Sequence, residues 1–381
     1  MKYDFLILGV GMQGKIAARD LLEHDNSVFL ADLYKENASK ILKYPKTEFA
    51  IIDLSNIKET IELIKKVDPR VVLNCAEGDW NLNVYKACLQ TKKHVLDLGS
   101  DIPMTKKQFA MHKDFKKNDI VAITGCGSTP GINNIMLHHA HQLFDSVETI
   151  EVGFAWDSNI KKFVVPFSIQ SIIEEFTDPA PLIENGKLIE VNPLDRIEER
   201  NFREIGKQKC FLVRHPETYT FNLFNKKLGL KNLRYYAGFP SHSADTIRTF
   251  IDSGLGNKTP IIIDGKKIVP VDVLTQVLKK LPFPDGYTEK ENIWVHVWGK
   301  KNKKHHEILM ECIVNTLPGW EDAGCNVDTG MPASIMAIMV KNGTVTARGS
   351  FAPGPVIPVD LFFKELRERS MTVYQNGTVI N

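Results

Sequence analysis

The chain has 381 residues, of which 43 % are apolar and 25 % are charged, and its formal net charge is +2. This length is typical of two domains with separate cores, and the composition is that of a globular protein. The near-neutral charge excludes a general attraction to nucleic acid, and no apolar run approaches the roughly 20 residues of a membrane-spanning helix. We therefore predict neither a nucleic-acid nor a membrane partner.

The six cysteines are scattered, and none has the C-x-x-C or a similar metal-binding spacing. Free thiols suit a reducing compartment, and the N-terminus enters a strand pattern without the apolar region of a signal peptide. The sequence thus predicts a cytoplasmic location and no metal. The strongest basic run, residues 301–306, lies between two apolar stretches, which predicts a solvated hairpin tip.

The N-terminal segment has the pattern of a dinucleotide-binding unit. The apolar run Phe5–Leu8 leads into G-x-G-x-x-G, a helical stretch follows, and a second strand ends at Asp32. In such a unit the glycines allow a tight turn and a close approach of the pyrophosphate, while the acid accepts hydrogen bonds from the ribose. This predicts NAD as cofactor, and NADP stays open because Lys35 is close enough to reach a 2′-phosphate. The residues assigned to this part of the site are Gly9, Gly11, Met12, Gln13, Gly14 and Asp32.

Short apolar strands alternate with helical stretches as far as residue 125. This rhythm predicts a parallel sheet with right-handed crossovers, the doubly wound architecture known as a Rossmann fold. A ligand of such a sheet lies beyond the carboxyl ends of its strands. The further cofactor contacts expected there are Asp53, Leu54, Asn74, Cys75, Ala76, Leu98, Gly99, Gly125 and Pro130.

The pattern changes after residue 125. From there to residue 349 the chain is rich in strand patterns with fewer helices, which predicts an α+β domain with a mainly antiparallel sheet. We assign dinucleotide binding to residues 1–125, and substrate binding and dimerisation to residues 126–349. An exposed face of the second sheet predicts a homodimer.

Several motifs along the whole chain resemble the saccharopine dehydrogenase-like oxidoreductases, most closely their lysine 6-dehydrogenase group. The block from Phe167 to Lys187 is the most specific, because it lies outside the cofactor domain. The Pro-rich tail resembles the family's return to the cofactor domain, so the resemblance implies that residues 350–381 join residues 1–125. The matching motifs are residues 9–21, 94–99, 130–134, 167–187 and 352–358.

Two departures bear on the substrate. Saccharopine-forming reductases have Asp before the Pro-Gly pair, where this chain has Thr129. They also have G-G-x-P after the first strand of the second domain, where this chain has residues 153–157, Gly-Phe-Ala-Trp-Asp. Both departures weigh against a saccharopine substrate, and the second also departs from lysine 6-dehydrogenase.

The resemblance implies hydride exchange between a nicotinamide and a carbon that bears nitrogen. The main hypothesis is oxidative deamination of L-lysine. A second is a reductase that condenses an amine with a carbonyl compound, as saccharopine or carboxynorspermidine reductases do. A third is a non-catalytic dinucleotide sensor on the same fold. The first two need a group that moves a proton and charged anchors for the substrate, an amino acid or amine.

Candidate residues for this chemistry follow the predicted strands. Carboxylates after the fourth strand could hold an ammonium group or take its proton, although a polar loop capping the next helix is the alternative. Asp97 ends the fifth strand, and binding of local backbone N–H groups is its alternative role. Arg214 is a possible carboxylate partner. We assign proton transfer to Asp79, Asp97 and His215, and substrate binding to Glu77, Trp80, Trp156, Asp157, Arg214 and His242.

Overall fold

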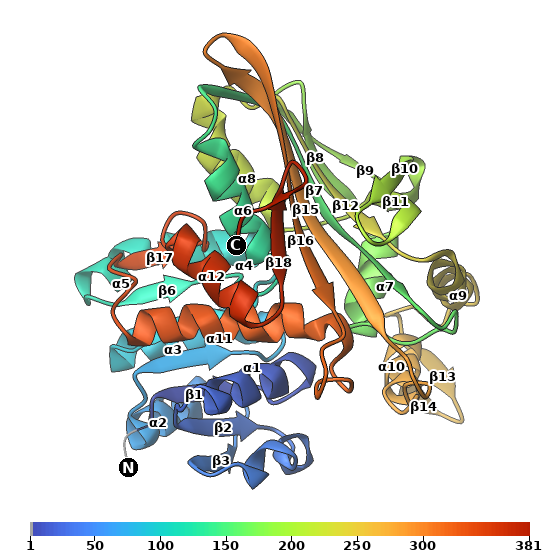
Figure 1. The fold of residues 1–381 in the computed structure, drawn as a ribbon. Coiled ribbons are helices and arrows are strands. Elements are labelled where there is room, and N and C mark those ends of the chain that lie inside the picture. Colours follow the sequence, from blue (N-terminus) through green and yellow to red (C-terminus); the bar gives the residue numbers. More distant parts are fainter. Residues whose placement is uncertain (1–2) are drawn as a thin grey trace.

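The computed structural model describes residues 3–381 and contains two large sheets with helices packed on them (Figure 1). The first sheet has seven parallel strands in the order β17-β6-β5-β4-β1-β2-β3, which confirms the predicted Rossmann architecture. Its strands are β1 Phe5–Leu8, β2 Val28–Asp32, β3 Thr47–Ile51, β4 Val71–Asn74, β5 His94–Asp97, β6 Val121–Ile123 and β17 Gly349–Phe351.

The central strands are short apolar runs because both faces of this sheet are covered. Side chains of α2 and α3 pack on one face and those of α1 and α11 on the other. Between α1 and β3 the chain forms two short 3-10 turns, Lys35–Ala38 and Ile41–Lys43. The helices of this part are α1 Met12–Glu23, α2 Ile57–Val67, α3 Asn81–Thr91, α4 Ile102–Ala110 and α5 His112–Lys117.

The second sheet has ten strands, and only the pair β7–β12 among its neighbours is parallel, which confirms a mainly antiparallel sheet. Its strands are β7 Ser146–Ser158, β8 Ala180–Glu184, β9 Lys187–Val191, β10 Ile197–Phe202, β11 Gly206–Leu212, β12 Asn232–Gly238, β15 Glu289–Lys301, β16 Lys304–Asn315, β18 Thr372–Gln375 and β19 Thr378–Val379.

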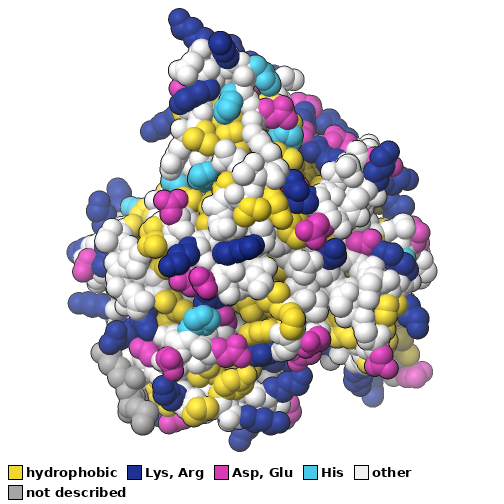
Figure 2. Space-filling view, in the orientation of Figure 1, with side chains coloured by type: hydrophobic (Ala, Val, Ile, Leu, Met, Phe, Trp, Pro, Cys, Tyr) yellow, Lys and Arg dark blue, Asp and Glu magenta, His cyan; other side chains and the backbone are white. Residues whose placement is uncertain are grey.

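The helices of the second part are α6 Ile132–His141, α7 Ile169–Thr177, α8 Glu217–Asn225, α9 Ser241–Asp252, α10 Pro270–Leu278, α11 Val327–Lys341 and α12 Val359–Glu368. A separate hairpin, β13 Ile261–Ile263 and β14 Lys266–Ile268, lies beside α10 (Figure 1). The basic run at residues 301–306 forms the tip of the β15–β16 hairpin, as predicted. Figure 2 shows Lys and His side chains gathered at that tip.

Helix α11 joins the two parts of the core. It is apolar on all sides and almost entirely buried, as a helix packed between two layers must be. It crosses α1 closely at Gly330, where an added Cβ atom would lie 2.5 Å from the Cβ atom of Ile16. The helix that follows the glycine-rich loop and the helix that begins at the second sheet are therefore in direct contact.

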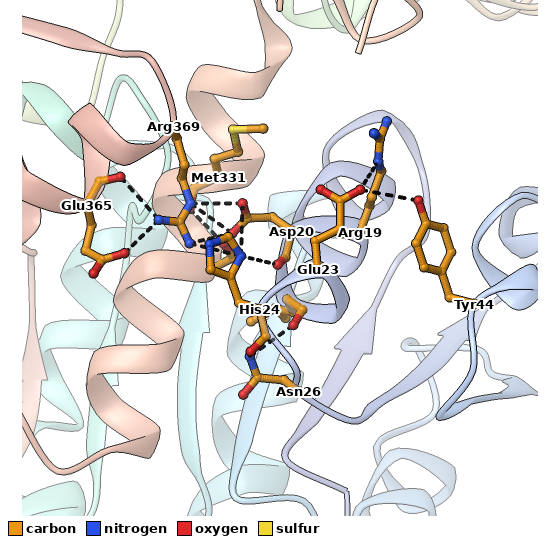
Figure 3. Close-up of polar contacts among 11 residues, drawn as sticks. Arg19, Asp20, Glu23, His24, Asn26, Tyr44, Met331, Glu365 and Arg369 are labelled. Atoms are coloured by element: carbon orange, nitrogen blue, oxygen red, sulfur yellow. Dashed lines mark hydrogen bonds and ion pairs between the residues drawn. The ribbon is translucent and has the colours of Figure 1, made fainter. Parts of the chain in front are cut away.

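The C-terminal segment contributes to both sheets. Strand β17 pairs with β6 in the first sheet, whereas β18 pairs with β16 in the second. The assignment of all of residues 350–381 to the first domain is therefore corrected, because the backbone after α12 turns back to the edge of the antiparallel sheet. The tail is also anchored to α1, where the Arg369 guanidinium donates to both carboxylate oxygens of Asp20 at 2.9–3.1 Å (Figure 3).

Within residues 3–381 no helix combines the length and apolar character needed to cross a bilayer. In the same range no group of His, Cys, Asp and Glu is arranged to hold a metal ion. The six cysteines are free thiols, five of them buried. The homodimer and the cytoplasmic location stay predictions.

Candidate active site

A cleft of about 1390 Å³ lies between the two parts of the molecule. One wall comes from the carboxyl ends of the parallel strands and the start of α1, and the other from β7, β15, α7 and the start of α11. This position agrees with the rule that ligands of open parallel sheets lie beyond the strands' carboxyl ends.

The glycine-rich loop has the shape of a dinucleotide cradle. Gly9 has a φ of +85°, and a Cβ atom there would lie 2.5 Å from the Ala76 nitrogen. A Cβ atom on Gly14 would lie 2.0 Å from Gly9 O, so helix and strand approach closely. A Cβ atom added to Gly11, in contrast, would have nothing within 4 Å. The loop therefore leaves room for a pyrophosphate at the N-terminus of α1, where Gly11, Met12 and Gln13 line the cleft.

Asp32 stabilises this loop through hydrogen bonds on the side away from the cleft. Its Oδ2 accepts a hydrogen bond from Val10 N at 2.6 Å, and its Oδ1 accepts from Tyr34 N and Asn37 Nδ2 at 2.9 Å each. The residue is only 9 % exposed and does not line the cleft. Its role in holding the loop was not anticipated, and its contact with a ribose stays a prediction.

The other predicted cofactor residues fall into two groups. Cys75, Ala76, Leu98, Gly99 and Pro130 line the cleft. Gly9, Gly14, Leu54, Asn74 and Gly125 do not, because they are buried behind the loops that form its surface, and Asp53 is exposed outside the cleft. Asn74, for example, donates to Asn81 Oδ1 at 2.7 Å, and Asn81 in turn donates to Gly99 O at 3.1 Å.

Asp97 does not reach the cleft, which corrects its assignment to proton transfer. It is fully buried, and it accepts hydrogen bonds from Gly99 N at 2.7 Å and Gly125 N at 3.2 Å. Gln108 Nε2 and Thr124 Oγ1 also donate to it, at 2.7 and 2.8 Å. It therefore binds local backbone N–H groups, the alternative weighed for it from the sequence, and holds together two loops that carry the cleft wall.

His215 lines the cleft just beyond β11 and is held by a buried carboxylate. Its Nδ1 forms a hydrogen bond with Glu217 Oε2 at 2.8 Å, and Asn133 Nδ2 donates to Glu217 Oε1 at 2.6 Å. The ring stacks on Tyr235 with centroids 4.1 Å apart. Burial lowers the pKa of His215, but the Glu217 carboxylate outweighs it, so the pKa is raised. These contacts leave Nε2 to face a ligand.

Four of the carboxylates that line the cleft have raised pKa values, and we call these residues, Glu175, Glu289, Glu291 and Asp328, the acid wall. Burial raises the pKa of all four, to about 8 for Glu175 and about 7 for Asp328. Among residues 3–381 none forms an ion pair with Lys or Arg. The buried atoms Glu175 Oε2 and Asp328 Oδ2 also accept no hydrogen bond there.

The acid wall was missed by the sequence analysis. Glu289 and Glu291 lie two residues apart in a strand and so point to one face, a signal that the sequence does carry. Glu175 and Asp328 come from the inner face of α7 and the first turn of α11, and only the folded chain brings them to β15.

Only some of the predicted substrate residues lie at the cleft. Glu77, Asp79, Trp156 and Arg214 line the cleft, while Trp80, Asp157 and His242 do not. Asp157 is turned aside because it accepts hydrogen bonds from Lys161 Nζ at 2.6 Å and Ser158 N at 2.8 Å. Trp80 lies in the turn before α3 and His242 in α9, both away from the cleft. Arg214 keeps only loose ion pairs, 3.6 Å from Asp101 and from Asp178.

Comparison with known proteins identifies related sequences and a related fold. The profile of the saccharopine dehydrogenase NADP binding domain matches residues 5–123, and that of the saccharopine dehydrogenase C-terminal domain matches residues 127–371. A saccharopine dehydrogenase (L-Glu forming) from Saccharomyces cerevisiae has the same fold over the full length of both chains, with a TM-score of 0.77 at 14 % identity.

Two curated relatives are similar in sequence. A carboxynorspermidine synthase from Vibrio alginolyticus is 26 % identical over 80 % of this chain and 77 % of its own length. A carboxyaminopropylagmatine dehydrogenase from Synechocystis is 24 % identical over 96 % of both chains. With both domain profiles matched in order, the chain belongs to the saccharopine dehydrogenase family and is an NAD(P)-dependent oxidoreductase.

Proposed function

We propose that the protein is a reductase that joins an amine to a carbonyl compound, and that the amine carries a second cationic group, an ammonium or a guanidinium. The amine and the carbonyl form an imine with loss of water. Reduction by NAD(P)H and uptake of one proton then give a secondary amine and NAD(P)⁺. The acid wall is the observation that carries this proposal.

An amine fits the acid wall because its carboxylates lack cationic partners in the protein. Burying a carboxylate without a partner is unfavourable, so the protein holds these groups partly protonated, as their raised pKa values indicate. An ammonium group in the cleft supplies the missing charge and donates to Glu175 Oε2 or Asp328 Oδ2. A substrate with one ammonium group at the wall and one reacting amine near the nicotinamide would use the whole cleft.

Arg214 is suited to bind a substrate carboxylate, and His215 is suited to transfer protons. Arg214 lines the cleft with only loose partners, so it is available to bind a substrate carboxylate. His215 can take a proton from the attacking amine and return one to the departing hydroxyl, because Glu217 brings its pKa upward from the ordinary value. When bound, the nicotinamide supplies the hydride.

The names of the curated relatives agree with this proposal more than with lysine deamination, since the synthase and the dehydrogenase are both named for carboxylated amines. Oxidative deamination of L-lysine is the second candidate. It is supported by the motifs that resemble lysine 6-dehydrogenase, and by an acid wall and an arginine that suit the two ends of lysine.

The test is NAD(P)H oxidation by purified protein with 1,3-diaminopropane, 1,4-diaminobutane or agmatine, each beside aspartate semialdehyde. Reactions that lack either partner are the controls, as is L-lysine with NAD⁺ at alkaline pH. We expect oxidation only when amine and carbonyl are both present. NADH formation and ammonia release from lysine alone would replace the proposal by deamination. Tight dinucleotide binding without turnover in any reaction would support the sensor.

A further inference from the structure

The glycine-rich loop reaches the second domain through one side chain. Gln13 Nε2 donates a hydrogen bond of 2.6 Å to Asn326 Oδ1, although the residues are 313 positions apart. Asn326 Nδ2 in turn donates to Pro166 O at 2.7 Å. All three residues line the cleft. The cradle for the pyrophosphate is thus joined to two segments of the opposite wall.

The orientation of both amides follows from Pro166. A backbone carbonyl can only accept, so Asn326 must present its NH₂ group to Pro166 and its oxygen to Gln13. Gln13 must then direct its own NH₂ group to Asn326. Its Oε1 atom is buried and accepts no hydrogen bond from residues 3–381. A hydroxyl or amide N–H group of a ligand in the cleft would donate the hydrogen bond that this oxygen lacks.

Asn326 belongs to a short turn, Gly324–Asn326, that also contacts one carboxylate of the acid wall and lies next to another. The neighbouring Cys325 N donates to Glu289 Oε2 at 2.8 Å. Asp328 follows in the first turn of α11, where Thr329 Oγ1 donates to its Oδ1 at 2.9 Å. A shift of this turn would therefore move two of the four carboxylates.

We infer that Gln13 is a positioning residue that couples dinucleotide binding to the acid wall. A donor group of the dinucleotide at Gln13 Oε1 fixes this side chain, and the bonds to Asn326 and Pro166 then hold the turn and its carboxylates in place. Linkage makes the effect reciprocal, so a bound amine must also tighten dinucleotide binding. The inference rests on the proposed function only for the identity of the amine.

Backbone hydrogen exchange tests the coupling without any amine. Exchange is measured in segments 164–168 and 324–329 of the full chain, with and without NADP⁺ or NAD⁺. We expect the nucleotide to slow exchange there about tenfold in the unmodified protein and in the control Gln142→Leu, which changes the exposed residue that follows α6. In Gln13→Leu the segments should respond less than about twofold, although the nucleotide still binds.

Calorimetry then measures the affinity of 1,4-diaminobutane with and without saturating nucleotide. We expect a ratio of at least about five in the unmodified protein and near one in Gln13→Leu. Asn326→Leu, which leaves the glycine loop untouched, should give the same loss. A ratio that survives in both variants, or segments that respond equally in Gln13→Leu, would overturn the inference. If no diamine binds to any variant, the proposed substrate is wrong, and the exchange result alone decides the coupling.

Discussion

His215, Glu217 and Asn133 form a chain of hydrogen bonds that ends at the cleft. A buried carboxylate behind a histidine fixes its tautomer and stabilises its charged form. Glu217 is completely buried, and Asn133 occupies its second oxygen. The sequence indicates His215 as a candidate, but not the partners that distinguish it from His242.

Replacing Glu217 by Gln should change the pH dependence of kcat/KM. His215 must be neutral to take a proton from the amine, and Glu217 raises its pKa, so activity is lost as the pH falls through that pKa. Without the carboxylate the acidic limb should move about one pH unit or more toward lower pH. Glu217→Asp keeps the charge and serves as the control. A limb that stays in place in Glu217→Gln would exclude His215 as the titrating group.

Glu175 should make the ligand-free protein less stable at alkaline pH. Its pKa is raised to about 8 by burial, so the folded state favours the protonated form, and stability falls as the pH rises from about 4.5 to 8. In Glu175→Gln the fall in Tm between pH 5 and pH 8 should be smaller, and the diamine should bind more weakly. Its neighbour Glu174, which is half-exposed and pairs with Lys258 Nζ at 2.6 Å, is the matched control, and Glu174→Gln should retain the original fall. An identical fall in both variants would contradict the assignment.

At the scale of single elements, local pattern predicts some features and cannot predict others. The β1–α1–β2 unit follows from an apolar run, spaced glycines and an acid that all lie within about thirty residues. β17 is only three residues long, and its pairing with β6 joins segments more than 220 positions apart. No local periodicity reports such a contact, and the same is true of the acid wall, which draws on α7, β15 and α11.

The tail after α12 depends on one buried ion pair. Arg369 and Asp20 have side chains that are 3 % and 2 % exposed, and Glu365 Oε2 accepts a second hydrogen bond from the guanidinium at 2.7 Å (Figure 3). Arg369→Met leaves the Asp20 carboxylate buried without its partner, so unfolding free energy should fall by about 3–5 kcal/mol in denaturant titrations. The exposed Arg367 provides the control, since Arg367→Met should cost less than about 1 kcal/mol. A similar small loss in Arg369→Met would show that the pair does not anchor the tail.

At the scale of the whole molecule, the cleft is assembled from both sheets and from the helix between them. One wall carries the glycine loop, and the other carries carboxylates, an arginine and a histidine. The two walls meet at α11, which packs on α1 and carries Asp328 in its first turn. In the proposed function, this arrangement would hold the amine on the wall opposite the dinucleotide.

The most direct test of this account follows the hydride itself. Purified protein is incubated with 1,4-diaminobutane, aspartate semialdehyde and NAD(P)H deuterated at C4 of the nicotinamide, and the products are analysed by mass spectrometry. We expect a secondary amine whose mass is that of both partners less water plus two hydrogens, with one of these two as deuterium on the carbon of the new C–N bond. Deuterium in an alcohol formed from the semialdehyde, with the diamine unchanged, would contradict it.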